Sequence, residues 1–216
     1  MRIGVLASGS GSNLQAILDA CAARAIPAQV AAVICNVADA GALRRAEAAG
    51  VPALLLPHQK AASREEYDRE LVGALRKHGV DLVCLAGFMR LITPVLLRAF
   101  EHRILNIHPS LLPAFPGLHA VRQALAAGVR VSGCTVHVVD EGTDTGPIVI
   151  QAAVPVLDGD TEETLAARIL VQEHRCYPRA ISLWAQGRVR IEGARVRITG
   201  AAGTADRTLA SPDLSD

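Results

Sequence analysis

The sequence lacks any apolar run close to the roughly 20 residues that a membrane-spanning helix requires, so we expect no membrane partner. It also lacks an excess charge of one sign, because 22 lysines and arginines against 21 aspartates and glutamates leave a formal net charge of +1. A nucleic-acid-binding face must neutralise phosphates, so this balance argues against a nucleic-acid partner. The first residues enter a strand-like run directly, which leaves no room for a secretory signal.

The five cysteines are odd in number, widely spaced and without a CxxC pair, which argues against both a disulfide framework and a zinc site. Such usage favours reduced thiols and therefore a cytoplasmic protein. The chain has 216 residues, half of them apolar, and is long enough for one domain with a sizeable core. We expect residues 1–199 to form that domain, and residues 200–216, which are poor in apolar side chains, to be a disordered tail.

Strand-like and helix-like segments alternate through the first half of the chain, which predicts a mostly parallel sheet with helices on both faces. The expected strands are 2–7, 29–35, 51–56, 82–86 and 103–107, and the expected helices are 13–23, 40–49, 63–78 and one opened by Thr93 and Pro94. Ser63 and Glu66 predict a capping box, in which each side chain binds the other residue's backbone N–H.

The pattern changes after residue 108. A proline-rich loop, HPSLLPAFPG, precedes a helix expected at 118–127. Strand-like runs at 131–139 and 147–154 are joined by a loop so short that they should pair antiparallel. Asp160 is expected to cap a long helix that Pro178 kinks or interrupts, and the runs 188–192 and 195–199 predict a closing hairpin.

The motif SGSGSN, residues 8–13, joins the first strand to the first helix. Its glycines let a ligand approach the backbone, and free N–H groups at the start of a helix attract an anion. It is not a full dinucleotide fingerprint, because Leu14 replaces the third glycine and Asn36 follows the second strand where an acidic residue should bind ribose. We therefore expect a monophosphate rather than NAD; the alternative is a tight turn that binds nothing.

The motif NIHPSLLP, residues 106–113, stands at the carboxyl end of the fifth strand. Residues two apart on a strand point to one face, so Asn106 and His108 should project together where open α/β sheets bind ligands. An amide donor beside an imidazole suits a reaction that develops an oxyanion and moves a proton. The alternative is a polar pair satisfied within a loop junction.

The motif DEGTDTGP, residues 140–147, has carboxylates at Asp140 and Asp144 in partial agreement with a calcium loop. Gln151 stands in the twelfth position, where a bidentate glutamate is needed, so we expect no calcium. A carboxylate here could instead orient the histidine and favour its charged form. A solvated acidic turn is the alternative.

Three further histidines, His119, His137 and His174, lack metal-ligand spacing, so we expect no metal. A hydrogen-bonded core position is the simpler interpretation of His137. Arg90, which follows the fourth strand in LAGFMRLI, suits a carboxylate or a phosphate, although a single arginine is more often solvated.

In combination, these motifs resemble those of the phosphoribosylglycinamide formyltransferases across residues 1–190. The matching stretches are SGSGSNLQAI, SREEYDREL, LAGFMRLITP, LNIHPSLLPAFPGLHA, DEGTDTGPIV and QEHRCYP. The resemblance implies an α/β, Rossmann-like formyltransferase fold, with a mostly parallel central sheet flanked by helices and antiparallel strands in the C-terminal part. It also implies transfer of the formyl group of 10-formyltetrahydrofolate, as co-substrate, to the amine of N1-(5-phospho-D-ribosyl)glycinamide, a step of de novo purine biosynthesis.

The same resemblance implies a set of site residues. The catalytic group would be Asn106, His108 and Asp144. The sugar phosphate would lie on Gly11, Ser12 and Asn13, with Glu173 at the ribose hydroxyls. The folate would lie along Met89, Arg90, Leu91, Ile92 and Asn106 and along the loop Asp140, Glu141, Gly142, Thr143 and Asp144, with Arg64 near its glutamate tail. Ser10, Ala114 and Leu170 depart from the family pattern, which has Asn, Lys and Gln there, in the phosphate cradle and the mobile loop.

The chemistry of these residues agrees with that assignment. An α-amino nucleophile is near its pKa at neutral pH, so the difficult part is the tetrahedral oxyanion and the release of the folate nitrogen. Asn106 and a protonated His108 can stabilise and protonate the oxyanion, without a metal. The rival interpretations are a related formyltetrahydrofolate hydrolase or another formyl-folate enzyme, a non-catalytic folate- or nucleotide-binding module, and an NAD oxidoreductase.

Overall fold

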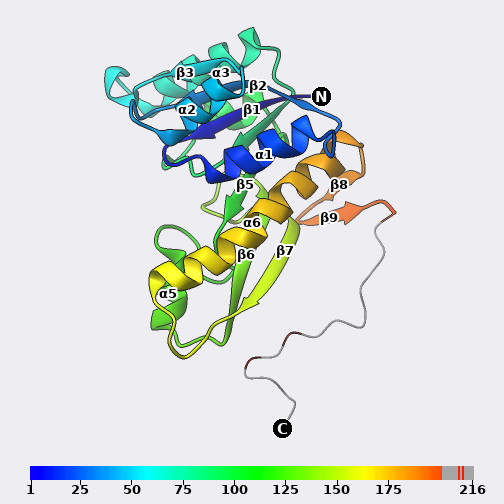
Figure 1. The fold of residues 1–216 in the computed structure, drawn as a ribbon. Coiled ribbons are helices and arrows are strands. Elements are labelled where there is room, and N and C mark those ends of the chain that lie inside the picture. The colour runs from blue at the N-terminus through cyan, green and yellow to red at the C-terminus, as the bar shows by residue number, and fades with distance from the viewer. Residues whose placement is uncertain (201–208, 210, 212–216) are drawn as a thin grey trace.

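A seven-stranded sheet forms the centre of the molecule in a computed structural model that describes residues 1–200, 209 and 211 (Figure 1). Its strands are β1 (Arg2–Ala7), β2 (Gln29–Cys35), β3 (Ala53–Leu55), β4 (Leu82–Leu85), β5 (Ile104–His108), β6 (Val131–Val138) and β7 (Ile148–Pro155). They lie in the order β3-β2-β1-β4-β5-β6-β7. The first five are parallel, and β6 is antiparallel to both β5 and β7, which confirms the predicted sheet.

Helices cover both faces of this sheet. One face packs against α1 (Ser12–Ala22), α2 (Gly41–Ala48), α5 (Ala120–Ala126) and α6 (Glu162–Ala185), and the other against α3 (Arg64–Lys77) and α4 (Pro94–Ala99). Successive strand residues point to opposite faces, so Val5 belongs to the first core and Leu6 to the second. A 3₁₀ turn, η1 (His58–Lys60), precedes α3, and β8 (Val189–Glu192) pairs with β9 (Arg195–Ile198) as the predicted hairpin.

Local signals set most of the element boundaries. β1 and β2 have the predicted bounds, whereas the predicted strand 51–56 shortens to Ala53–Leu55, because Pro52 has no N–H for the sheet ladder. The cap of α4 is confirmed, since Thr93 Oγ1 accepts from Val95 N at 3.3 Å with Pro94 at the first helical position. His119 has a left-handed φ of 59°, so α5 begins at Ala120 rather than at 118.

Two predictions about helix ends need correction. Ser63 Oγ accepts from Glu66 N at 3.1 Å as expected, but the Glu66 carboxylate passes Ser63 and accepts from Ala62 N at 2.7 Å. Thr161 rather than Asp160 caps α6, because the Asp160 carboxylate is occupied by the guanidinium of Arg168, at 2.6 and 2.8 Å.

The predicted interruption of α6 at Pro178 is wrong, because the helix continues to Ala185 (Figure 1). Proline removes one backbone hydrogen bond from a helix interior and strains the preceding turn. Tyr177, Ala180 and Ile181, on both sides of it, are fully buried against the sheet, and this packing offsets the loss.

Two expectations bear on the ends and the environment of the chain. Residues 201–208, 210 and 212–216 of the expected tail lie outside the described part. Among the described residues, no helix has both the length and the apolar character needed to cross a membrane.

Candidate active site

The carboxyl ends of β1 and β4 mark the point where the strand order reverses, which is where open α/β sheets bind ligands. The segments that follow these two strands are hydrogen-bonded to each other. Ser8 N donates to Gly87 O at 3.0 Å, and Met89 N donates to Ser8 Oγ at 2.9 Å. The glycine motif after β1 is therefore a neighbour of the stretch 89–92 after β4. In the sequence these are two separate motifs.

The glycine motif ends at the N-terminus of α1. Gly11 caps this helix with a left-handed φ of 75° and no side-chain cap, so side chains leave the first-turn N–H groups free for a ligand. A Cβ at Gly11 would lie 2.7 Å from Ala42 Cα, which explains why glycine is needed there. The free N–H groups in the first turn of α1 are therefore of the kind that can bind an anion.

Asn13 and Glu173, far apart in the sequence, meet beside this turn. Asn13 Nδ2 donates to Glu173 Oε2 at 2.7 Å, and Asn13 Oδ1 is buried without a hydrogen-bond partner among the described residues. Burial raises the pKa of Glu173, and the hydrogen bond from Asn13 partly offsets that effect. A buried acceptor and a carboxylate side by side can both bind hydroxyl groups.

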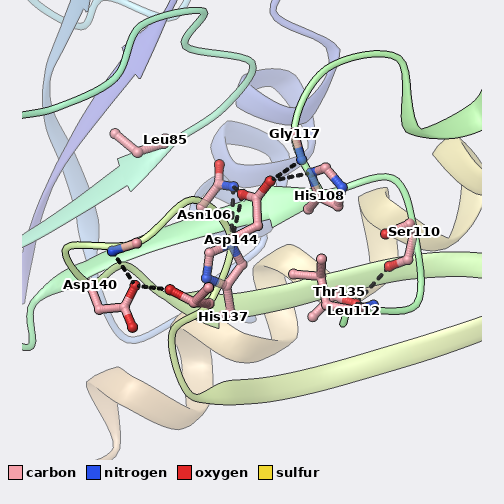
Figure 2. Close-up of polar contacts among 12 residues, drawn as sticks. Leu85, Asn106, His108, Ser110, Leu112, Gly117, Thr135, His137, Asp140 and Asp144 are labelled. Atoms are coloured by element: carbon pink, nitrogen blue, oxygen red, sulfur yellow. Dashed lines mark hydrogen bonds and ion pairs between the residues drawn. The ribbon is translucent and has the colours of Figure 1, made fainter. Parts of the chain in front are cut away.

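The predicted trio Asn106, His108 and Asp144 also comes together (Figure 2). The first two lie on β5 and point to the same face, and the loop between β6 and β7 carries Asp144. Its Oδ2 lies 3.4 Å from His108 Nδ1 and accepts from Gly117 N at 2.8 Å. Its Oδ1 lies 3.4 Å from Asn106 Nδ2. Gly117 is a member that the sequence did not indicate.

Both ring nitrogens of His108 face a hydrogen-bond acceptor. Its Nε2 lies 2.9 Å from Phe115 O, which can only accept a hydrogen bond, and its Nδ1 faces the carboxylate of Asp144. A ring with a single proton would leave one of these acceptors facing a lone pair, whereas a doubly protonated ring donates to both. The side chain is only 7% exposed, so water cannot substitute for either partner.

His137 completes the cluster, and the sequence did not predict this role. It pairs with Asn106 across β5 and β6, its Nε2 lies 3.5 Å from Asp144 Oδ1 and 3.1 Å from Asn106 Nδ2, and its Nδ1 lies 3.1 Å from Val138 O. The expectation of a buried, hydrogen-bonded histidine was correct, but its carboxylate partner was not foreseen. Only the strand register reveals that contact.

Several groups hold Asp144 in its ionised form. The hydrogen bond with His137 comes first, followed by the Gly117 N–H and the charges of His108 and His137, and together they lower the pKa of Asp144 from 3.8 to about 2 against the effect of burial. Asp144 also has a left-handed φ of 56°, which is uncommon outside glycine. The site therefore contains a fixed negative charge between two imidazoles.

The expected folate-binding residues are exposed or half-buried. Met89 and Leu91 are 69% and 60% exposed, and the guanidinium of Arg90 lies 4.7 Å above the ring of Tyr67. Asp140 Oδ1 accepts from Gly142 N and Thr145 Oγ1, at 3.1 and 2.7 Å, and so shapes the loop. Three of the other expected residues are exposed, namely Arg64, Glu141 and Thr143, and Ile92 is half-buried. Arg64 is the first residue of α3.

In the part of the chain that the structure describes, no three His, Cys, Asp or Glu side chains are grouped so that they could hold a metal ion. His119 caps α5, and His174 lies on α6 with a buried Nε2 that has no hydrogen-bond partner among the described residues. The thiols of Cys21, Cys35, Cys84, Cys134 and Cys176 are all free.

Comparisons with known proteins agree with this geometry. Residues 1–181 match the formyl transferase family. A phosphoribosylglycinamide formyltransferase of Escherichia coli is 49% identical over 191 residues, which cover 88% of this chain and 90% of that protein. The crystal structure of glycinamide ribonucleotide transformylase 1 from Symbiobacterium toebii superposes with a TM-score of 0.91 at 62% identity, covering 92% of this chain and 93% of that one.

A longer relative matches equally well. The trifunctional purine biosynthetic protein adenosine-3 of Drosophila pseudoobscura pseudoobscura is 52% identical over 191 residues, which cover 88% of this chain. These residues make up only 14% of that protein, so the chain corresponds to a small part of it.

Proposed function

Since this chain belongs to the formyl transferase family, we propose that it transfers the formyl group of 10-formyltetrahydrofolate to the amine of N1-(5-phospho-D-ribosyl)glycinamide, in purine biosynthesis. The observation that carries this proposal is the contact of Asp144 with both Asn106 and His108, beside an anion-binding loop. The named activity of the Escherichia coli relative, which this chain matches over 90% of its length, supports it.

Each residue of the cluster has a task in such a transfer. As the amine forms its bond to the formyl carbon, Asn106 Nδ2 and the His108 imidazolium donate to the oxygen that becomes negative. His108 can give up its proton to that oxygen, and Asp144 keeps the ring aligned and stabilises its positive charge. When the bond from carbon to the folate nitrogen breaks, the oxygen returns its proton to His108 as the carbonyl re-forms. The folate nitrogen takes up the proton that the amine has lost, so atoms and charge balance.

Phe115 O is the acceptor that the substrate would replace. In the protein alone this carbonyl binds His108 Nε2 at 2.9 Å. The formyl oxygen can accept the same hydrogen bond from His108 Nε2 if the loop that carries Phe115 moves away. His108 would then exchange one acceptor for another without changing its contact with Asp144.

The remaining candidate residues would bind the two substrates. The first turn of α1, at Gly11, Ser12 and Asn13, would hold the phosphate, and Glu173 would accept hydrogen bonds from ribose hydroxyls. Met89–Ile92 and the loop 140–144 would hold the folate, with Arg64 near its carboxylates. We propose small-molecule substrates only, no metal, and a cytoplasmic location.

A formyl-transfer assay tests this function against the hydrolase alternative. The purified chain is given 10-formyltetrahydrofolate with glycinamide ribonucleotide or with water alone. We expect tetrahydrofolate to appear only with the amine, together with one formylated product for each donor consumed. Equal release of formate in water would identify a hydrolase, and binding of folate without turnover would identify a binding module.

A further inference from the structure

Helix α2 donates hydrogen bonds to two backbone carbonyl groups of the glycine loop. Ala42 N donates to Gly9 O at 3.2 Å, and Arg45 Nε donates to Ser10 O at 2.9 Å. The two segments are in direct contact, because a Cβ at Gly41 would lie 2.6 Å from Ser10 O. Two successive loop carbonyls are therefore bound to one helix.

These bonds determine where the loop N–H groups point. A trans peptide is planar, and its C=O and N–H point in opposite directions. With the carbonyls of Gly9 and Ser10 directed at α2, the N–H groups of Ser10 and Gly11 point away from it. Neither N–H donates to another group among the described residues. Successive free N–H groups of this kind form an anion-binding concavity, continuous here with the first turn of α1.

Arg45 is itself held in place. Its Nη1 donates to Gln15 Oε1 at 3.1 Å, and Gln15 Nε2 donates to Asp19 Oδ1 at 2.8 Å, so α1 anchors the guanidinium that α2 carries. These two bonds use two of the five N–H donors of the guanidinium, and its positive charge remains beside the loop.

The charge of Arg45 also extends to α6. Burial, and after it the positive charge of Arg45, lowers the pKa of His174, which follows Glu173 on that helix. The half-buried Leu170, one turn earlier on α6, has no polar group to offer a phosphate. Arg45 is thus a cation that contacts the loop at Ser10 and lies close enough to α6 for its charge to act on His174.

We propose that Arg45 is a positioning residue of the phosphate site. It fixes the Ser10–Gly11 peptide so that the Gly11 N–H points at the phosphate, and it adds the positive charge that Leu170 does not supply. This role rests on the proposed function, since it requires a phosphorylated substrate at the loop.

The test compares Arg45→Met with Arg45→Lys and with a matched control, Arg44→Met. Arg44 precedes Arg45 on α2 and lines the same hollow beside Ser10, but it is exposed. For each variant, KM and kcat are measured with glycinamide ribonucleotide and with the same compound lacking its phosphate, and inhibition by inorganic phosphate is measured in parallel.

For Arg45→Met we expect KM for the sugar phosphate and the inhibition constant of phosphate to rise roughly 10- to 100-fold, as for loss of a charged hydrogen bond. The kcat should be unchanged, and so should kcat/KM for the compound without phosphate. Arg45→Lys should restore part of the affinity, because it keeps the charge but not the guanidinium geometry. Arg44→Met should change KM by less than about threefold, as for a surface charge.

An unchanged KM in Arg45→Met, or an equal loss with the compound lacking phosphate, would overturn the proposal, because a general structural defect affects both compounds. If Arg45→Met does not fold, Gln15→Met keeps Arg45 but removes the anchor of its Nη1, together with the bond to Asp19, and should still raise KM for the phosphorylated compound alone. Failure of the proposed function is a separate result: the unmodified chain would then not formylate the sugar phosphate at all.

Discussion

Asp144→Asn should damage catalysis far more than binding. Asp144 Oδ2 accepts from Gly117 N and lies 3.4 Å from His108 Nδ1. Its Oδ1 accepts from Asn106 Nδ2 and lies 3.5 Å from His137 Nε2. An asparagine has one acceptor oxygen and one NH₂ donor. In either orientation of the amide, its NH₂ group would face Gly117 N or Asn106 Nδ2, which are themselves donors. The substitution therefore removes the negative charge and half of the acceptor contacts at once.

The magnitude follows from the electrostatics of the site. The lowering of the Asp144 pKa from 3.8 to about 2 corresponds to about 2 kcal/mol of interaction that favours the carboxylate. Most of this interaction comes from the hydrogen bond with His137, followed by the Gly117 N–H and the charges of His108 and His137. Asp144→Asn therefore removes a carboxylate that its surroundings keep ionised beside His108. Positioned acid–base groups contribute about 10²–10⁴ in rate, and kcat should fall within that range.

Steady-state kinetics of Asp144→Asn, His108→Ala and the double variant measure this effect. KM for the sugar phosphate should change little, because its phosphate is held at the glycine loop, while KM for the folate can rise because the same loop borders its site. The double variant should be far from additive if the two residues act as a unit. Asp158→Asn, on a surface side chain that is 85% exposed and paired with Arg130, is the control and should keep normal kcat. A near-normal kcat in Asp144→Asn would refute the mechanism.

Three further outcomes are expected. Ser12→Asp puts a carboxylate in the first turn of α1. Repulsion of like charges should raise KM for the sugar phosphate roughly 10- to 100-fold, with a much smaller change in kcat. An unchanged KM in steady-state assays would show that the phosphate does not bind there. Activity should survive exhaustive chelation, because oxyanion stabilisation is assigned to Asn106 and His108, and activity that is lost and then restored by zinc would contradict that assignment. The carboxylate contacts of Asp144 should add stability above about pH 3.8 and lose it as the pH falls through about 2, so melting temperatures of the unmodified chain and Asp144→Asn should converge in that interval.

Local patterns in the sequence were sufficient for most of the sheet. The apolar runs 2–7 and 29–35 form β1 and β2 with no change of bounds, because a strand buried on both faces needs apolar residues throughout. The signals at helix ends were less reliable. Asp160 is a good capping residue, yet Arg168, two turns into the helix, occupies its carboxylate, and Thr161 caps instead.

Pro178 shows how tertiary packing overrides a local rule. A proline in a helix interior costs about 3 kcal/mol by propensity alone, which is why the sequence predicts a break. The long helix α6 packs its apolar side on β6, β7 and α1, and Tyr177 OH lies 3.0 Å from both Leu85 O and Leu105 O. Contacts between segments that far apart cannot be derived from helix propensity.

In the candidate site, too, local patterns predicted some residues, and long-range contacts decided the others. Asn106 and His108 were predictable as a pair, because both lie on one strand and the period of a strand is two. His137 was not, since its position opposite Asn106 depends on the register between β5 and β6, and the sequence contains no turn that would set it. Gly117 was missed for a similar reason, because it contributes a backbone N–H rather than a recognisable side chain.

The position of Asp144 depends on both of these missed partners. The loop between β6 and β7 folds back over the sheet, and Asp144 takes a left-handed φ of 56° that is unfavourable for a residue with a Cβ. Hydrogen bonds from Asn106 Nδ2 and Gly117 N and the close approach of His108 and His137 hold its two oxygens and offset that cost. The strained backbone and the low pKa of Asp144 therefore have one cause, since the contacts that hold the loop in place are also those that keep the carboxylate charged beside His108.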